Sequence, residues 1–191
     1  MTRPDDQLRV AADVVGALRR LGFDPVLVGG MALVVLGSRR VTQDFDFLIA
    51  DPADRVAPVL DVFYDRGFEL ASTLDAAGDV VTTIGNRKVA AARFQLDQPA
   101  SAYFFNRAIT LRIDLLFDFP VPAASIAARA TRMKISGHAF VIASEPDLLE
   151  LKRMARAARS FAGDAQDIEF LESRLPRSGS ASTSKKPRGR R

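Results

Sequence analysis

Some segments of this chain have apolar residues at helical spacing, and others are short apolar runs typical of strands. The order of these segments predicts the helices and strands of the protein. Residues 5–21 carry apolar side chains every three to four positions, which is the spacing of one helical face, and Gly22 favours a stop. Residues 25–28 and 43–49 are short apolar segments typical of buried strands. Two consecutive glycines and a short helix over residues 31–37 are predicted between these strands.

The rest of the chain continues to mix strand-like and helix-like segments, with proline and glycine at the breaks. The pattern predicts a helix over 52–66, a hairpin of 80–84 with 88–96, a strand over 108–117, a helix over 123–130, a hairpin of 131–135 with 139–143, and helices over 145–160 and 164–175. This mixture predicts an α/β or α+β layered domain over residues 1–175. Its core is expected over residues 22–120, followed by a C-terminal hairpin and helices over 121–175.

The charge of the chain is unevenly distributed. The pI is 9.8, but residues 176–191 hold six Lys and Arg residues and no acid. The remaining 21 basic and 23 acidic residues give the body a net charge of −2. We therefore expect a near-neutral domain with a disordered basic tail, instead of a basic domain built to bind nucleic acid.

Two residue types are too scarce for certain chemistries. The chain has no cysteine, which excludes disulfides and thiolate catalysis, and its single histidine, His138, excludes a His-rich metal site. The N-terminus lacks the apolar core of a secretory signal, and the longest uncharged apolar run, residues 25–38, is too short to span a bilayer. We expect a soluble, cytoplasmic protein that makes no membrane contact.

Two aspartates, Asp44 and Asp46, interrupt the second predicted strand. Because side chains alternate between the faces of a strand, both carboxylates point to one side, and the neighbouring phenylalanines point to the other. Arg40 and Thr42 share the aspartate face if the chain is already extended there. Carboxylates this close repel unless a cation lies between them, and Mg²⁺ or Mn²⁺ would complete its coordination with phosphate oxygens and water.

A third carboxylate, Asp114, lies inside the apolar segment "LRIDLLF". If this strand neighbours the one carrying Asp46, the acids form a three-carboxylate cluster able to hold two metal ions. The alternative is an ordinary ion pair between Asp114 and an arginine such as Arg112 or Arg132.

The glycine pair and a downstream lysine extend this hypothesis. Gly29 and Gly30 lie between a strand and a helix, where free backbone N–H groups suit a phosphate. Lys152 belongs to a helix whose other basic residues indicate a solvated face, and it could reach a triphosphate. Asp164 and Asp167 are most simply acids in the first turn of the last helix.

The stretch "VGGMALVVLGSRRVTQDFDFLI" resembles the signature of the polymerase-β-like nucleotidyltransferase superfamily. The closer likeness is to minimal bacterial nucleotidyltransferases and the AbiEii-type toxin group, which show a similar run of Arg40, Thr42, Asp44 and Asp46. "LRIDLLF" resembles the strand of the third acid, and the segment from "IASEPDLLELK" onward resembles the C-terminal helices. The chain departs from the most active members by having Gly30 in place of a serine.

The resemblance implies a mixed β-sheet flanked by helices and transfer of a nucleoside monophosphate from an NTP to a hydroxyl, with release of pyrophosphate. It implies that Asp44, Asp46 and Asp114 bind metal and that Asp114 also accepts the proton of the acceptor. The implied nucleotide-binding residues are Gly29, Gly30, Arg40, Thr42 and Lys152. The acceptor would be a protein, a tRNA or a small molecule, and the family implies a possible cognate antitoxin or toxin as partner.

Three other hypotheses remain open from the sequence. A protein that binds nucleotide or a partner without turnover, such as an antitoxin-like regulator, would keep the same acids. A glycosyltransferase also uses an Asp-x-Asp pair, although the glycine pair and the third acid argue against it. A nucleic-acid-binding module would depend on the tail alone.

Overall fold

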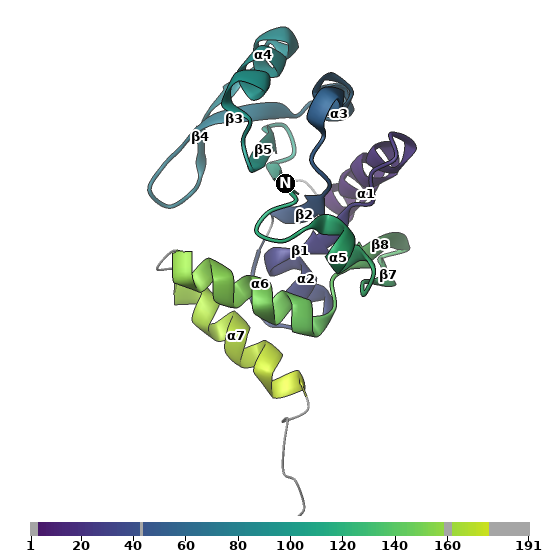
Figure 1. Ribbon diagram of the computed structural model, residues 1–191, viewed down its shortest axis with the longest axis vertical. Coiled ribbons are helices and arrows are strands. Elements are labelled where there is room, and N and C mark those ends of the chain that lie inside the picture. Colours follow the sequence, from purple (N-terminus) through teal and green to yellow (C-terminus); the bar gives the residue numbers. More distant parts are fainter. Residues whose placement is uncertain (1–3, 43, 159–161, 176–191) are drawn as a thin grey trace, which may run out of the picture.

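The computed structural model describes residues 4–42, 44–158 and 162–175, and these form a mixed sheet with helices on both faces (Figure 1). The strands are β1 (Val26–Val28), β2 (Phe45–Ile49), β3 (Glu69–Leu74), β4 (Val80–Ile84), β5 (Ser101–Asn106), β6 (Leu111–Phe117), β7 (Thr131–Ile135) and β8 (His138–Ile142). The helices are α1 (Pro4–Arg20), α2 (Gly29–Val35), α3 (Val56–Tyr64), α4 (Arg87–Asp97), α5 (Ala123–Ala127), α6 (Glu145–Ala158) and α7 (Ala162–Arg174), with a 3₁₀ turn, η1 (Ala53–Arg55), before α3.

The eight strands lie in the order β4-β3-β5-β6-β2-β1-β8-β7. β2 runs parallel to β6, and β1 runs parallel to β8, whereas the other neighbours are antiparallel. The C-terminal hairpin of β7 and β8 therefore extends the same sheet that contains the central strands. This mixed sheet confirms the predicted α+β class.

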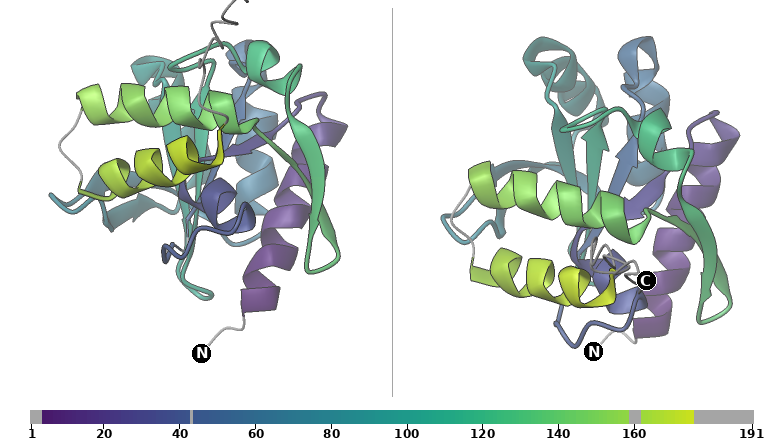
Figure 2. Two further views of the ribbon diagram at one scale, coloured as in Figure 1. Left: turned by 90° about the horizontal axis from the view of Figure 1, so that it is seen from below. Right: turned by 60° about the horizontal axis from the view of Figure 1, so that its bottom comes forward.

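The helices form two layers. α1 and α3 pack on one side of the sheet, and α6 and α7 lie next to each other across the other side (Figures 1 and 2). Phe45 and Phe47 of β2 are almost completely buried, and their rings stack with Phe140 of β8 at centroid distances of 6.3 Å. The phenylalanines thus form the buried face, as the alternation predicts.

The predicted strand over residues 88–96 is wrong, because the segment forms helix α4. Asn86 caps this helix through its side-chain oxygen, which accepts hydrogen bonds from the backbone N–H groups of Lys88 and Val89. Ala90 and Phe94, four residues apart, are its buried positions. This helical spacing and the cap outweigh the apolar residues that suggested a strand. β4 has no partner from this segment and pairs with β3 instead.

Strands β3 and β5 were not predicted, and β6 is shorter than the predicted strand over 108–117. β5 alternates between buried and partly exposed side chains along its length, and it forms a hairpin with β6. The turn between them includes Thr110, whose φ of +50° ends the extended conformation before Leu111. The sheet is consequently wider than the sequence pattern indicated.

The remaining predicted elements agree with the structure within a few residues. α2 begins at Gly29 itself, so the glycine pair is the first turn of the helix and not a separate turn before it. Arg40 and Thr42 lie in irregular backbone ahead of β2 and not on an extended strand. The predicted disordered tail lies outside the described residues. No helix in the described ranges is long and apolar enough to cross a membrane.

Candidate active site

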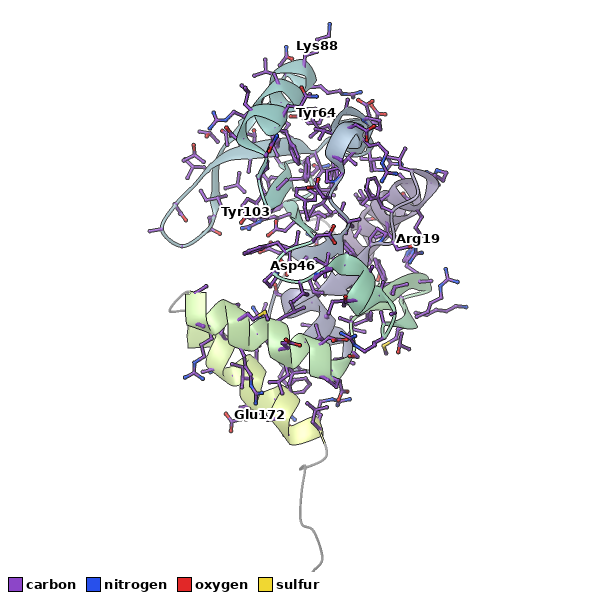
Figure 3. All side chains as sticks on the ribbon, viewed as in Figure 1. Arg19, Asp46, Tyr64, Lys88, Tyr103 and Glu172 are labelled. Carbon is purple, nitrogen blue, oxygen red and sulfur yellow. The ribbon has the colours of Figure 1, made fainter. Side chains whose placement is uncertain are left out.

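The sheet register brings two of the predicted acids together. Asp46 on β2 pairs directly with Asp114 on the parallel strand β6, so both side chains leave the same face of adjacent strands, about 4.8 Å apart along the sheet. On the other side of β2, Asp46 pairs with Val28, the residue before Gly29. Asp46 lies at the centre of the molecule, between the sheet and helix α6 (Figure 3).

Asp44 completes this acidic group from the segment that leads into β2. Its charge raises the pKa of Asp46 and of Asp114, and its own pKa is raised, first by burial and then by Asp79 at the β3–β4 turn. The guanidinium groups of Arg112 and Arg40 oppose this shift. Sequence reasoning missed Asp79, because an acid in a hairpin turn is ordinarily only a turn residue.

Burial dominates the electrostatics of the other two acids. Asp114 is only 4% exposed, and burial raises its pKa to about 7, with Asp46 and Asp44 adding to the shift and Arg112 opposing it. The pKa of Asp46 is also raised, first by burial, while the charge of Lys152 and a hydrogen bond from the backbone N–H of Gly30 oppose the shift. Adjacent carboxylates in such a setting favour a shared proton or a bound cation.

The raised pKa of Asp114 predicts how the stability of the metal-free protein depends on pH. The folded state keeps this proton up to a pH of about 7, whereas the unfolded chain releases it near 3.8. The free energy of unfolding should therefore fall as pH rises between these values, by roughly 4 kcal/mol at most for this group. Urea unfolding in EDTA from pH 5 to pH 8 should show a flatter profile for Asp114→Asn than for wild type. Parallel profiles would contradict the assignment, and exposed Asp54→Asn is the matched control.

The two glycines fit closely against two side chains of the site. Gly29 has a φ of +65°, and a Cβ at this position would lie 1.8 Å from Oδ2 of Asp46. A Cβ at Gly30 would lie 2.9 Å from the guanidinium carbon of Arg40. The absence of a side chain at both positions therefore lets Asp46 and Arg40 approach the start of α2.

Gly29→Ala should destabilise the protein more than Gly37→Ala. Both residues have a positive φ, which costs an alanine about 1–2 kcal/mol, but a Cβ at Gly37 meets no atom within 4 Å. The collision with Asp46 should add about 1–3 kcal/mol in Gly29→Ala. Urea denaturation of both variants measures the difference, and adding Asp46→Gly to Gly29→Ala should recover the added part. Equal losses in the two alanine variants would show that the close contact has no energetic weight.

Lys152 is buried in a network of charges, which corrects the expectation of a solvated basic face. It is 7% exposed, and its Nζ lies 2.7 Å from Oδ2 of Asp167 and 3.3 Å from Oδ1 of Asp164. Asp167 also forms an ion pair with Arg40. The charge of Lys152 reaches Asp46, whose pKa it lowers. The network therefore connects α6 and α7 to the loop before β2, through Arg40.

Asp164 and Asp167 are consequently more than acids of a first helical turn. They are 0% and 3% exposed, and they hold the two basic side chains that were predicted to bind nucleotide. Their spacing of three residues on one helix, after a lysine on the preceding helix, was visible in the sequence. The spacing alone does not show that α6 and α7 pack with these residues at their interface. Thr42 is partly buried and lies in the same loop as Arg40, ahead of β2.

Arg112 forms the ion pair with Asp114 that the sequence offers as an alternative to a metal site. Its Nε donates to Oδ1 and its Nη2 to Oδ2 of Asp114, both at 2.7 Å. Its Nη1 donates to the backbone oxygen of Gly78 at 2.6 Å, and its guanidinium carbon lies 4.8 Å from the ring centre of Tyr103. The alternate positions Arg112 and Asp114 on one strand allowed the pair to be foreseen.

The donor set suits Mg²⁺ or Mn²⁺ in chemical type. Asp44 and Asp46 offer carboxylate oxygens beside each other, and burial makes an added cation favourable there. However, in the part of the chain that the structure describes, no group of three or more His, Cys, Asp or Glu side chains is placed to hold a metal ion. The residues fit a site based on the aspartate pair, with Asp114 beside it and bound by Arg112.

No protein-family model matches the chain, and no curated protein matches it by sequence. Solved structures do share its fold. An antigenic nucleotidyltransferase-like protein from Paracoccidioides brasiliensis has a TM-score of 0.53 at 18% identity, covering 87% of this chain and 75% of that one. The antibiotic-resistance factor ANT(2″)-Ia has a TM-score of 0.55 at 10% identity, covering 90% of this chain and 85% of that one. The lincosamide antibiotic adenylyltransferase LnuA, bound to lincomycin, has a TM-score of 0.52 at 12% identity, covering 86% and 96%.

The chain therefore has a nucleotidyltransferase-like fold, in agreement with the resemblance seen in its sequence. At these identities the likeness establishes the fold and not the reaction. The resemblance to the AbiEii-type group stays a prediction.

Proposed function

We propose that this protein is a metal-dependent nucleotidyltransferase that moves a nucleoside monophosphate from an NTP to a hydroxyl group. The observation that carries the proposal is the direct pairing of Asp46 with Asp114 on parallel strands, with Asp44 two residues away and Gly29 against the Asp46 carboxylate. Two structural neighbours, ANT(2″)-Ia in complex with adenylyl-2″-tobramycin and LnuA, support the same class of chemistry.

The residues of the site would divide the reaction between them. Asp44 and Asp46 would hold Mg²⁺ or Mn²⁺, which when bound would neutralise charge on the triphosphate. The acceptor oxygen would attack the α-phosphorus of the NTP while the bond from that phosphorus to the bridging oxygen breaks, so that pyrophosphate leaves. The proton of the acceptor hydroxyl would pass to Asp114. Arg112 donates hydrogen bonds to both oxygens of Asp114, so Asp114 would bind a metal ion only if Arg112 moved away.

Basic groups and backbone N–H groups would position the triphosphate. Gly29 and Gly30 begin α2 beside Asp46, while Lys152 and Arg40 approach the same place from α6 and from the loop before β2. Positioning and charge neutralisation contribute most of the catalysis of phosphoryl transfer, so fixed cations are the groups that this reaction needs. Thr42 would contribute a hydroxyl next to them.

The proposal leaves three acceptor classes, namely a protein, a tRNA and a small molecule. The test is to incubate the full chain with each α-³²P-labelled NTP, Mg²⁺ and separated protein, RNA and small-molecule fractions of a bacterial lysate. Label should enter one fraction with one preferred NTP, and the Asp44→Ala/Asp46→Ala double variant should lose it. Absence of label from every NTP, with NTP binding intact by calorimetry, would replace transfer with a nucleotide-binding role.

A toxin–antitoxin role is the finer form of this proposal. It predicts that expression of wild-type protein arrests bacterial growth, while the Asp44→Ala/Asp46→Ala variant does not. Normal growth with wild-type protein that labels an acceptor in vitro would retain the transferase and remove the toxin role.

A further inference from the structure

Arg112 lies two residues before Asp114 on β6 and contacts its carboxylate. Its two donated hydrogen bonds, each of 2.7 Å, form a fork that engages both carboxylate oxygens at once. A fork of this kind is the strongest contact that an arginine makes with a carboxylate. The chelating edge of Asp114 is therefore already taken by a cation that belongs to the protein.

Arg112 is itself fixed by contacts beyond Asp114. Its third nitrogen donates to the backbone oxygen of Gly78, and its guanidinium group lies over the ring of Tyr103. The side chain is 17% exposed. Moving it away from Asp114 would break two charge-assisted hydrogen bonds and leave a buried carboxylate without its cation, so the fork is a stable part of the site.

We propose that Arg112 takes the place of a second metal ion, so that the protein binds one divalent cation through Asp44 and Asp46 while Arg112 remains on Asp114. This inference depends on the proposed metal-dependent transfer, and it makes Arg112 a positioning residue for Asp114. It departs from the three-carboxylate, two-metal site that the sequence suggested.

The test is the number of Mn²⁺ ions bound per chain, measured on the full chain with Mn²⁺ alone by electron paramagnetic resonance of the free ion. Wild type should bind one ion, and Asp114→Asn should still bind one with similar affinity. Asp46→Asn should weaken binding by far more than the roughly 10–100-fold seen when a ligand's supporting contact is lost. Arg112→Gln should bind a second ion, because the substitution removes the guanidinium group that engages both oxygens of Asp114.

Two further variants keep the result interpretable. Arg112→Lys retains the charge without the fork and should bind one ion, and exposed Arg132→Gln is the matched control that should also bind one. Two ions in wild type, one of which is lost in Asp114→Asn, would overturn this inference and leave the transferase intact. No bound ion in wild type would overturn the proposed metal dependence together with the inference.

Discussion

Asp46→Asn should abolish nucleotidyl transfer and leave the protein at least as stable as wild type. The carboxylate is central to the proposed metal site, and a metal ion contributes several kcal/mol of transition-state stabilisation, so the rate should fall about 10³-fold or more. Stability should not fall, because burial and Asp44 already disfavour the charge on Asp46, and a neutral amide of the same shape removes that cost.

This pair of results separates a functional residue from a structural one. The transfer rate is measured with the labelled NTP and the fraction that wild-type protein labels, and the free energy of unfolding is measured with urea. Asp54→Asn removes an exposed carboxylate from η1 and should change neither quantity. An Asp46→Asn variant that transfers label at a near wild-type rate would remove the acidic group from the mechanism. A large loss of stability would instead make Asp46 a structural acid.

Lys152→Met should destabilise the protein by about 3–5 kcal/mol, which is the usual cost of removing one partner from a buried ion pair. Lys152 contacts both Asp164 and Asp167 from inside the α6–α7 interface, and these acids are almost completely buried. Methionine keeps most of the length of the side chain, so the fall in the free energy of unfolding comes from the missing charge and not from a large cavity. Urea unfolding at neutral pH measures it.

The neighbouring residue provides the matched control. Arg153 forms an ion pair of 2.6 Å with Glu172 across the same two helices, but both side chains are at least half exposed. Arg153→Met should therefore cost less than about 1 kcal/mol, since solvent screens exposed pairs. Equal losses in Lys152→Met and Arg153→Met would mean that the buried network does not stabilise the packing of α6 on α7.

The central strands and their acids were predictable because the pattern that identifies them lies within a few consecutive residues. Period-two alternation placed Phe45 and Phe47 on the buried face and Asp46 on the other, and the structure confirms both. Helix α1 was predictable for the same reason, since its apolar positions repeat with helical spacing over seventeen residues. In such segments the side chains that set the pattern are close together in the chain.

Segments with mixed preferences were not predictable in this way. Helix α4 was mistaken for a strand because its apolar residues lie on several sides and only Ala90 and Phe94 are buried. Its cap at Asn86 also lies in a stretch that suits a hairpin turn. β3 and β5 were missed although each pairs with a predicted strand, β4 and β6 respectively. β3 buries a single side chain, so its own sequence pattern is weak. Tertiary contacts decide the conformation of segments whose local preference is weak.

The sequence by itself determined that two aspartates share one face of a strand, that a glycine pair precedes them, and that a third acid interrupts another apolar strand. Only the tertiary structure decided that Asp114 lies directly beside Asp46, that Arg112 holds it, and that Lys152 is buried against Asp164 and Asp167. The physical reason is the separation along the chain of the residues that interact. Alternation within a strand follows from backbone geometry, whereas strand order and helix packing depend on contacts between residues far apart in the chain, and these contacts fix the partner of each buried charge.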